Sequence, residues 1–250
     1  MPTTLITGAS SGLGAEMARQ LAARGHDLAL CARRTERLEV LKAELTTAYP
    51  QRRVEVRALD VNDDAAVFEV FAAFREDFGS LDRVIVNAGL GKGAPIGTGR
   101  YDANKQTAMT NFVAALAQCE AAMEIFRAQK RGHLVMISSV SAMRGMPKTV
   151  TTYAATKAGV AALAEGIRSE MLGQRDLDIR VSTIYPGYIR SEMNERVKHT
   201  PFIVDTATGV RAMVEAIEAE KAHARVPAWP WVPLGWAMHN LPLKAVRRLL

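Results

Sequence analysis

The sequence predicts an α/β protein in which one doubly wound parallel sheet is covered by helices on both faces. Short β-branched or apolar runs alternate with helical patterns along the chain, which is the order of elements in such sheets. The first run also passes through a glycine-rich turn straight into a helical pattern. A chain of 250 residues suits one domain of this type.

The short runs are predicted to be strands, and the longer patterns between them are predicted to be helices. The strands are expected at residues 4–7, 27–31, 54–59, 83–86, 133–138 and 180–185. The helices are expected at residues 14–24, 35–48, 65–78, 105–129 and 153–172. Each helix is long enough to connect two parallel strands, and these crossovers should be right-handed. We assign residues 1–225 to this domain and residues 226–250 to a tail rich in proline, tryptophan and basic residues.

The amino-acid composition argues against several classes of function. The net charge of +6 and the pI near 9.5 would suit nucleic acid, but lysine and arginine are spread along the chain, so nucleic-acid binding is not expected. Cys31 and Cys119 are the only cysteines, which indicates neither a disulfide framework nor a cysteine-based metal site, and no metal is expected. Because the first strand begins by Thr3, no secretion signal is visible, and the cytoplasm is the expected compartment.

The glycine-rich turn is the first candidate binding element. Residues 7–14 read TGASSGLG and run into the helical pattern AEMARQLAARG. The first N–H groups of a helix are unpaired and the helix dipole is positive there, so a phosphate can bind where glycines let the backbone approach. A tight connection between a strand and a helix could also need these glycines. We expect a Rossmann-like sheet whose turn binds a pyrophosphate through Gly8, Ser10, Ser11, Gly12, Leu13 and Gly14.

A tyrosine and a lysine lie four residues apart at the start of the last predicted helix. Tyr153 and Lys157 share a face of that helix, so both side chains can reach the same cleft. A free tyrosine has a pKa of about 10, and a nearby ammonium group favours the phenolate and lowers that pKa. The pair therefore suits proton exchange with a substrate, although the same spacing is also common on helix surfaces.

Together, these motifs resemble the short-chain dehydrogenase/reductase family. The resemblance covers about residues 3–195 and rests on the GxxxGxG spacing within TGASSGLG, on Asn87-Ala88-Gly89 and on the sequence YAATK at residues 153–157. It implies an oxidoreductase that transfers a hydride between a nicotinamide cofactor and a carbonyl or alcohol carbon, with Tyr153 as the proton donor or acceptor. It also implies that Lys157 binds the ribose of the nicotinamide.

The end of the second predicted strand favours NADP(H). NAD-binding folds usually carry an acidic residue there, which accepts hydrogen bonds from the adenosine ribose, whereas this chain has Arg33 and Arg34. A guanidinium group binds and neutralises a 2′-phosphate, which a carboxylate would repel. The resemblance favours Arg33 of the two. Both arginines could instead be solvated residues that precede the next helix.

The resemblance assigns further residues to the cofactor. Asp60 and Val61 are expected beside the adenine ring, although Asp60 could equally cap the following helix. The segments expected to line the cofactor cleft and to bind the nicotinamide carboxamide contain Asn87, Ala88, Gly89, Pro186, Gly187, Ile189 and Ser191. Ser191 replaces the more usual threonine and keeps its hydroxyl group.

Two more polar positions are expected at the reacting centre. Ser139 follows the fifth predicted strand and should donate a hydrogen bond to the substrate oxygen, which stabilises the charge that develops there. It lies 14 residues before Tyr153, one more than is usual in the family, so Ser141 is a rival. Asn111 matches the family asparagine that holds a water in the proton relay from Lys157, while a buried asparagine needs some polar partner in any case.

The predicted reaction is the reduction of a carbonyl to an alcohol by NADPH, or the reverse, on a hydrophobic or acyl-type substrate. Segments 90–101 and 192–206 should contact the substrate, because they follow strand ends and are rich in glycine, proline and polar residues. Apolar residues near the cleft favour such a substrate, namely Met143, Met146, Tyr185, Tyr188 and Met193. The alternative is a regulatory protein that binds NADP(H) without turnover, against which the intact Tyr153 and Lys157 argue.

The tail combines tryptophans with basic residues, namely Trp229, Trp231, Trp236, Lys244, Arg247 and Arg248. This combination suits contact with a membrane interface. Prolines at positions 227, 230, 233 and 242 interrupt any spanning helix, so the tail is not predicted to cross a membrane. The tail could instead fold over the substrate cleft or lie in a subunit interface. By resemblance, a homodimer or homotetramer is expected, joined through the helices that contain Asn111 and Tyr153.

Overall fold

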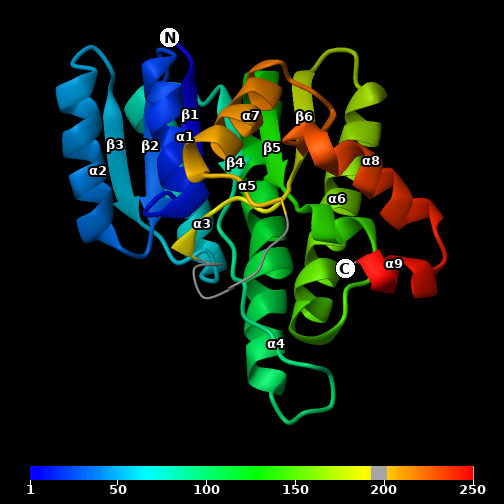
Figure 1. Ribbon diagram of the computed structural model, residues 1–250. Coiled ribbons are helices and arrows are strands. Elements are labelled where there is room, and N and C mark those ends of the chain that lie inside the picture. The colour runs from blue at the N-terminus through cyan, green and yellow to red at the C-terminus, as the bar shows by residue number, and fades with distance from the viewer. Residues whose placement is uncertain (193–201, 250) are drawn as a thin grey trace.

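The central feature of the protein is one parallel β-sheet. The computed structural model describes residues 1–192 and 202–249. Within these residues, seven strands form a sheet in the order β3-β2-β1-β4-β5-β6-β7 (Figure 1). The strands are β1 (Thr3–Thr7), β2 (Asp27–Ala32), β3 (Val54–Ala58), β4 (Arg83–Val86), β5 (Arg131–Ile137), β6 (Asp178–Pro186) and β7 (His223–Val226). The predicted doubly wound parallel sheet is confirmed.

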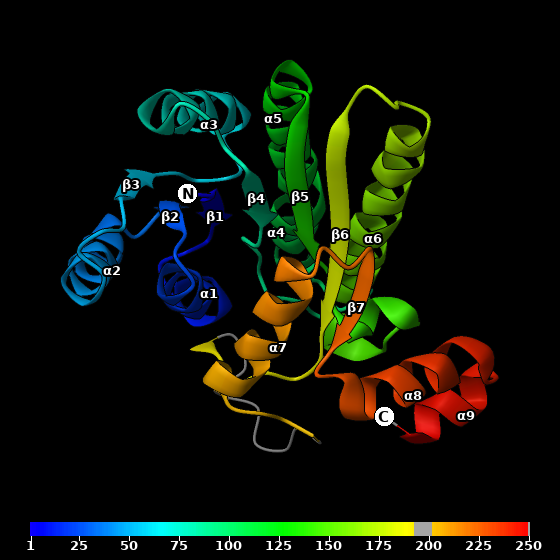
Figure 2. The same ribbon diagram turned by 90° about the horizontal axis from the view of Figure 1, so that it is seen from above.

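Helices cover both faces of the sheet (Figure 2). One face is covered by α1 (Gly12–Ala23), α2 (Thr35–Ala48) and α7 (Thr206–Glu218), and the other by α3 (Asp64–Phe78), α5 (Ala114–Gln129) and α6 (Thr151–Leu172). Every residue of β1 and β4 is buried, as expected for strands that are covered on two sides. Two apolar cores, one on each face, therefore hold the strand ends in fixed positions.

Two predicted features differ from the structure. Strand β7 was not among the predicted elements, because it is short and its sequence, HARV, shows no continuous apolar run. The preceding helix α7 was not predicted either, although its buried residues recur with helical spacing. The single helix expected at residues 105–129 is divided into α4 (Tyr101–Ala108), a π-helical turn at Met109–Val113 and α5. Such wide turns inside helices often occur at functional sites.

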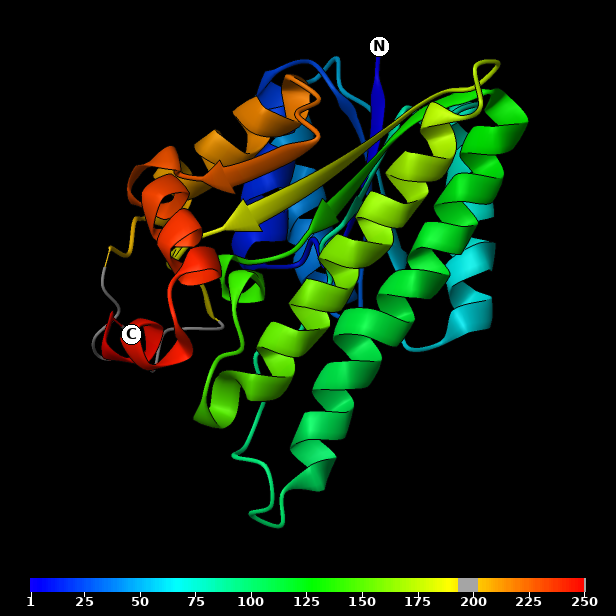
Figure 3. The ribbon, with the colours of Figure 1, turned by 90° about the vertical axis from the view of Figure 1, so that its right-hand side faces the viewer.

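The tail is helical and packs against the body of the protein. It forms α8 (Ala228–Asn240) and α9 (Leu243–Leu249), which lie at the end of the sheet toward which β6 and β7 point (Figure 3). Met238 and Val246 are buried in a small apolar cluster with Met146 and Ala154. Among the described residues, no helix is both long and apolar enough to cross a membrane.

Candidate active site

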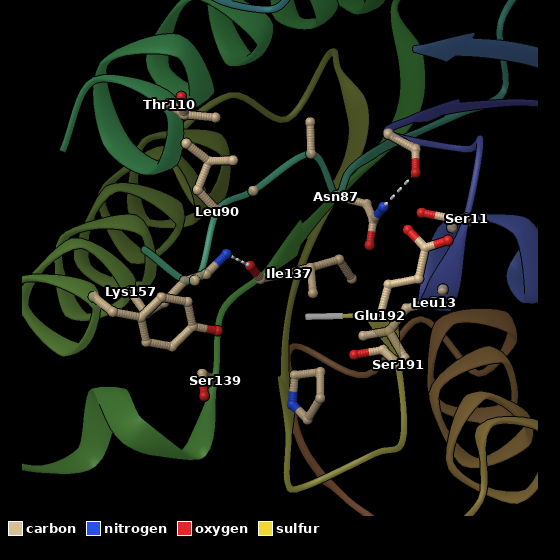
Figure 4. A pocket seen from close by; sticks show the side chains of 18 of the residues that line it. Ser11, Leu13, Asn87, Leu90, Thr110, Ile137, Ser139, Lys157, Ser191 and Glu192 are labelled. Carbon is tan, nitrogen blue, oxygen red and sulfur yellow. Dashed lines mark hydrogen bonds between the residues drawn. The ribbon is translucent and has the colours of Figure 1, made fainter. Parts of the chain in front are cut away.

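A cavity of about 470 Å³ lies at the carboxyl ends of the strands. In open α/β sheets this edge is the usual place for a ligand, next to the point where the strand order reverses, here between β1 and β4. With one exception, every residue predicted above for catalysis or cofactor binding lines the cavity; the exception is Asn111. Ser139 and Lys157 lie on one side of the cavity, and Ser11, Ser191 and Glu192 lie on the other (Figure 4).

The glycine turn has the geometry that its residues require. Gly8 and Gly12 have φ angles of 66° and 54°, in the left-handed region that favours glycine. A Cβ at Gly14 would lie 2.4 Å from the carbonyl oxygen of Gly8, so only glycine allows this close approach. Helix α1 begins at Gly12, and the side chain of Ser11 does not cap it. The turn thus offers the start of a helix to an anion.

Arg34, which follows β2, and Arg37 of α2 form a cluster of hydrogen bonds with the glycine turn and Glu192. The guanidinium group of Arg34 donates to the hydroxyl of Ser11 at 2.6 Å and to that of Ser10 at 3.3 Å. It also donates to the carboxylate of Glu192 at 3.1 Å, and Arg37 donates to the same carboxylate at 2.5 Å. These contacts lower the pKa of Glu192. Neither Arg37 nor Glu192 was predicted as a cofactor residue, because the sequence does not reveal that the segment after β6 returns to α2.

Arg33 follows β2, Asp60 follows β3, and both line the cavity. Arg33 is 4.0 Å from the carboxylate of Asp60, and Asp60 accepts hydrogen bonds from the backbone and side chain of Asn62. The N-cap of α3 is Asp63, whose side chain accepts from Ala66 N. Asp60 therefore does not cap α3, and it lines the cavity instead.

Asn87 holds two strands together at the reversal point of the sheet. Its side-chain Nδ2 donates to the carbonyl of Thr7 at 2.9 Å, and its backbone N–H donates to the hydroxyl of Thr7 at 3.1 Å. Ala88 N donates to the same hydroxyl. These bonds tie the end of β4 to the end of β1, so the segment shapes the floor of the cavity.

Tyr153 and Lys157 meet in the cavity, both from the first turns of α6. Lys157 is 6% exposed, and its Nζ donates to the carbonyl of Ile137 at 2.8 Å. Burial lowers the pKa of Lys157 to about 8. Nζ lies 5.9 Å from the centre of the Tyr153 ring. The ammonium group is therefore near the phenol but directed to a backbone carbonyl.

The acidity of Tyr153 differs from the sequence prediction. Burial raises its pKa, and the hydrogen bond with the Ser139 side chain offsets this only in part. Lys157 was expected to lower the pKa of Tyr153, but in the protein by itself this pKa is raised. The loss of hydration of the phenolate outweighs the interactions that favour it. The neutral phenol is the favoured form of this side chain at neutral pH.

The three serines after β5 are in different environments. The hydroxyl of Ser138 donates to the carbonyl of Lys157 at 2.7 Å. Ser139 lines the cavity, and its Oγ accepts from the backbone N–H of Ser141 at 3.1 Å. Ser141 also lines the cavity. The backbone N–H of Ser141 thus orients the hydroxyl of Ser139, and Ser139 is the serine that interacts with Tyr153.

Asn111 lies in the π-helical turn and is 1% exposed. Its Oδ1 accepts from Leu90 N at 2.7 Å, and its Nδ2 donates to Leu90 O at 2.9 Å. A Cβ at Gly89 would lie 3.3 Å from Asn111 Oδ1 and 3.6 Å from Lys157 Nζ. Asn111 therefore positions the strand end behind Lys157 and does not face the cavity directly.

The segment after β6 closes the remaining side of the cavity. Gly187 N donates to Val226 O at 2.8 Å, which joins this segment to the end of β7. A Cβ at Gly187 would lie 1.9 Å from the indole nitrogen of Trp231, so glycine is needed for the tail to pack here. Tyr188 lines the cavity and contacts Trp231 edge to face, with 5.2 Å between ring centres. Met193, one of the predicted substrate contacts, lies outside the described residues.

The comparisons with known proteins agree with this geometry. Residues 2–201 match the family model of the short chain dehydrogenases. The chain belongs to the short-chain dehydrogenase/reductase family. It is 54% identical over 244 residues to an uncharacterized oxidoreductase of Mycobacterium tuberculosis, a match that covers 98% of this chain and 95% of the relative.

Solved structures of the family have the same fold as this enzyme. A short-chain dehydrogenase from Sphingobium yanoikuyae in complex with NADPH is 28% identical, with a TM-score of 0.82 and coverage of 97% of both chains. A bulky-bulky ketone specific alcohol dehydrogenase from Comamonas testosteroni is also 28% identical, with a TM-score of 0.79 and coverage of 97% of this chain and 96% of that one. This protein is accordingly an oxidoreductase that acts on alcohol or carbonyl groups, and its family uses nicotinamide cofactors.

Proposed function

We propose that this enzyme transfers a hydride between NADP(H) and the carbonyl or alcohol carbon of a hydrophobic or acyl-type substrate, with Tyr153 exchanging the proton. The observation that carries the proposal is that Tyr153, Ser139 and Lys157 line the same cavity as the glycine turn. The cofactor, when bound, supplies or accepts the hydride. A screen of ketones, steroids and 3-oxoacyl thioesters that follows NADPH absorbance tests this assignment.

The residues of the cavity fit a dinucleotide along its whole length. The glycine turn would hold the pyrophosphate, Asp60 and Val61 would lie beside the adenine, and Ile189 and Ser191 would bind the carboxamide. Lys157 would bind the nicotinamide ribose, and Asn111 would hold a water that links Lys157 to solvent. Held by these residues, the nicotinamide end of the cofactor would lie at the end of the cavity that Tyr153 lines.

The proton chemistry favours carbonyl reduction at neutral pH. The hydroxyl of Tyr153 carries at neutral pH the proton that must be given to the substrate oxygen, as a free tyrosine does, and burial raises its pKa further. Ser139 is the donor that would hold the same oxygen and stabilise its developing charge. Ser141, the rival, would orient Ser139 through its backbone N–H.

The rate of alcohol oxidation should increase as the pH rises above neutral. Oxidation needs the phenolate of Tyr153, whose pKa is raised, so kcat for oxidation should increase about tenfold per pH unit above neutral until that pKa is reached. Loss of the proton from Lys157, whose pKa is about 8, would act against this increase, so a rising profile reports the tyrosine. Steady-state oxidation rates between pH 6 and 10 check this. A rate that is flat across this range would contradict the assignment.

The choice of NADP(H) is supported by the cluster around Arg34. The guanidinium groups of Arg34 and Arg37 donate to the carboxylate of Glu192. The guanidinium group of Arg34 also donates to the hydroxyl groups of Ser10 and Ser11. A 2′-phosphate is an oxyanion of higher charge that can accept the same donors. We infer that Arg34 and Arg37 bind the 2′-phosphate, with Arg33 beside the adenosine, and that Glu192 gives up these donors when NADP(H) binds.

Substitutions of Arg34 and of Glu192 should change the affinity for NADPH in opposite directions. Arg34→Ala should weaken NADPH binding by about ten- to a hundredfold, because a charge-assisted contact is lost, and should change NADH binding little. Glu192→Gln should strengthen NADPH binding severalfold, because a competing carboxylate is removed. Glu36→Gln, which removes an equal charge from the first turn of α2, is the matched control. Titrations followed by cofactor fluorescence measure both effects, and equal changes for NADPH and NADH would reject this role.

The substrate is proposed to be a bulky, hydrophobic carbonyl compound or acyl derivative. The walls at the substrate end include Val150 and Tyr188, and Met146 lies in the apolar cluster between this wall and the tail. Similarity to an alcohol dehydrogenase specific for bulky-bulky ketones also favours a large substrate. Tyr185 stacks on His223 at 6.4 Å and does not line the cavity, so it does not contribute to this preference.

A homodimer or homotetramer is proposed through α5 and α6. Apolar side chains of the π-helical turn and α5 are exposed on this side, namely Met109, Phe112, Val113 and Leu116. Phe112 lies against Gly159 of α6, so the two helices present one continuous surface. Covering such a surface with the same surface of a second copy would bury these side chains.

A further inference from the structure

The tail divides its three tryptophans between two sides of α8. These are the only tryptophans in the chain. Trp231 is 3% exposed and packs on Gly187 and Tyr188, whereas Trp229 and Trp236 are 78% and 65% exposed. Two indole rings exposed to this extent are unusual, because so large an apolar side chain is normally mostly buried. The outward side of α8 therefore needs an explanation.

The exposed indoles belong to a set of exposed apolar and basic residues of the tail, which we call the α8–α9 face. It is formed by Trp229, Val232, Trp236, Leu243, Lys244 and Arg247. Val232 and Trp236 are four residues apart and share one side of α8, whereas Trp229 has a non-helical backbone at a kink near the start of the helix and joins the set by its exposure. Leu243 of α9 is 58% exposed and extends the apolar area.

The α8–α9 face is held firmly by contacts on its inner side. Met238 and Val246 are 4% and 1% exposed and pack on Met146 and Ala154. Leu241 N donates to Ala237 O at 2.9 Å, and Val246 N donates to Pro242 O at 3.1 Å, which closes the turn between the two helices. The apolar inner side is thus already satisfied by the protein, and the outward side chains remain exposed on a formed surface.

The charge of the tail indicates what can cover this surface. Residues 221–250 contain no aspartate or glutamate, and both Lys244 and Arg247 are exposed beside Leu243. A symmetric contact between two copies of this face would place the same cations against each other without an acidic partner. An anionic lipid surface supplies phosphates for the cations and an interface of intermediate polarity for the indoles.

We propose that the α8–α9 face docks on an anionic lipid membrane as a peripheral contact. The docking does not depend on the reaction, but it connects to the proposed function through the position of the tail. Behind the face, Trp231 contacts Tyr188, and Tyr188 lines the cavity. If the substrate is hydrophobic as proposed, docking brings the substrate end of the cavity near the lipid that dissolves such a compound.

Intrinsic fluorescence measures the docking directly, because every tryptophan lies in α8. The full-length protein is mixed with vesicles of equimolar phosphatidylcholine and phosphatidylglycerol, or of phosphatidylcholine alone. We expect a blue shift of the emission and sedimentation with the anionic vesicles, both weakened as salt is raised. Absence of binding to the anionic vesicles, or equal binding to both vesicle types at all salt concentrations, would overturn the proposal.

Variants separate the face from the rest of the surface. Trp229→Ala combined with Trp236→Ala should reduce partitioning at least about tenfold and leave Trp231 as a fluorophore that vesicles do not shift. Lys244→Gln combined with Arg247→Gln should reduce binding to anionic vesicles only. The control is Tyr101→Ala combined with Leu172→Ala, which removes side chains that are 75% and 81% exposed elsewhere.

Two further measurements keep the outcomes distinct. The tryptophan variants should reduce a water-soluble ketone at the unaltered rate, so a protein without any turnover contradicts the proposed function and leaves the docking result standing. Sedimentation velocity without vesicles should give the same oligomeric state for the variants and the unaltered protein. If the tryptophan variants dissociate and the unaltered protein ignores vesicles, the face binds a second copy and the membrane proposal is wrong.

Discussion

Tyr153→Phe should lower kcat for carbonyl reduction by about 10²- to 10⁴-fold, the usual contribution of a positioned proton donor. The phenylalanine keeps the ring but lacks the hydroxyl that interacts with Ser139. The dissociation constant of NADPH should stay within about twofold, because the glycine turn and the arginine cluster are not altered. Stopped-flow or steady-state absorbance of NADPH measures the rate, and fluorescence titration measures the binding.

Tyr188→Phe is the matched control for this prediction. Tyr188 lines the same cavity, and burial raises the pKa of its hydroxyl as well. It comes from the segment after β6, where no lysine lies at helical spacing from it. This variant should keep most of the turnover. Full turnover in Tyr153→Phe would show that the proton donor is assigned wrongly, and NADPH binding without turnover in the unaltered protein on every substrate class would favour a regulatory protein.

Gly14→Ala should weaken NADPH binding at least about tenfold and destabilise the fold by about 1–3 kcal/mol. The added Cβ would lie 2.4 Å from Gly8 O and 2.8 Å from Asn87 Nδ2, so the turn has to move away from β4. The shift displaces the backbone N–H groups that would face the pyrophosphate. Thermal unfolding measures the stability, and titration with NADPH measures the loss of affinity.

Gly166→Ala provides the control for a glycine in a helix without close neighbours. Gly166 lies in α6 and is exposed, and a Cβ there would meet nothing within 4 Å. This substitution should stabilise the protein by about 0.5–1 kcal/mol, because the unfolded chain loses conformational freedom. If Gly14→Ala behaved like Gly166→Ala, the close approach in the turn would have no functional meaning.

Local patterns explain why much of the fold could be predicted. Helix α2 begins and ends at Thr35 and Ala48 as expected, because its apolar residues recur with helical spacing on one buried side. Strand β7 was missed because its stability comes from pairing with β6, where His223 lies beside Thr183 and Val226 beside Pro186. A strand of four residues with alternating polar side chains carries too little local information to be recognised.

The candidate site shows the same division. Motif spacing predicted Gly8 and Tyr153 as site residues, and the family resemblance predicted Ser139 although its spacing to Tyr153 is one residue longer than usual; all three line the cavity. Glu192 was predicted only as the start of a substrate-contact segment and Arg37 was not predicted at all, because their contact joins segments that are 155 residues apart in the chain. The effect of burial on the pKa of Tyr153 could not be predicted either, since it depends on how many neighbouring elements exclude water from the phenol.

The sequence by itself determined the class of the fold, the order of its strands as far as β6 and the residue types that meet at the carboxyl edge of the sheet. Periodicity and glycine spacing are local properties of the chain, and a parallel sheet brings its strand ends to one edge whatever the details of packing. Tertiary structure alone decided that Glu192 is bound by Arg34, that burial raises the pKa of Tyr153, and that Trp231 is buried while Trp229 and Trp236 are exposed. Solvent exclusion and long-range contacts depend on the positions of segments that are distant in the chain, so no local pattern can encode them.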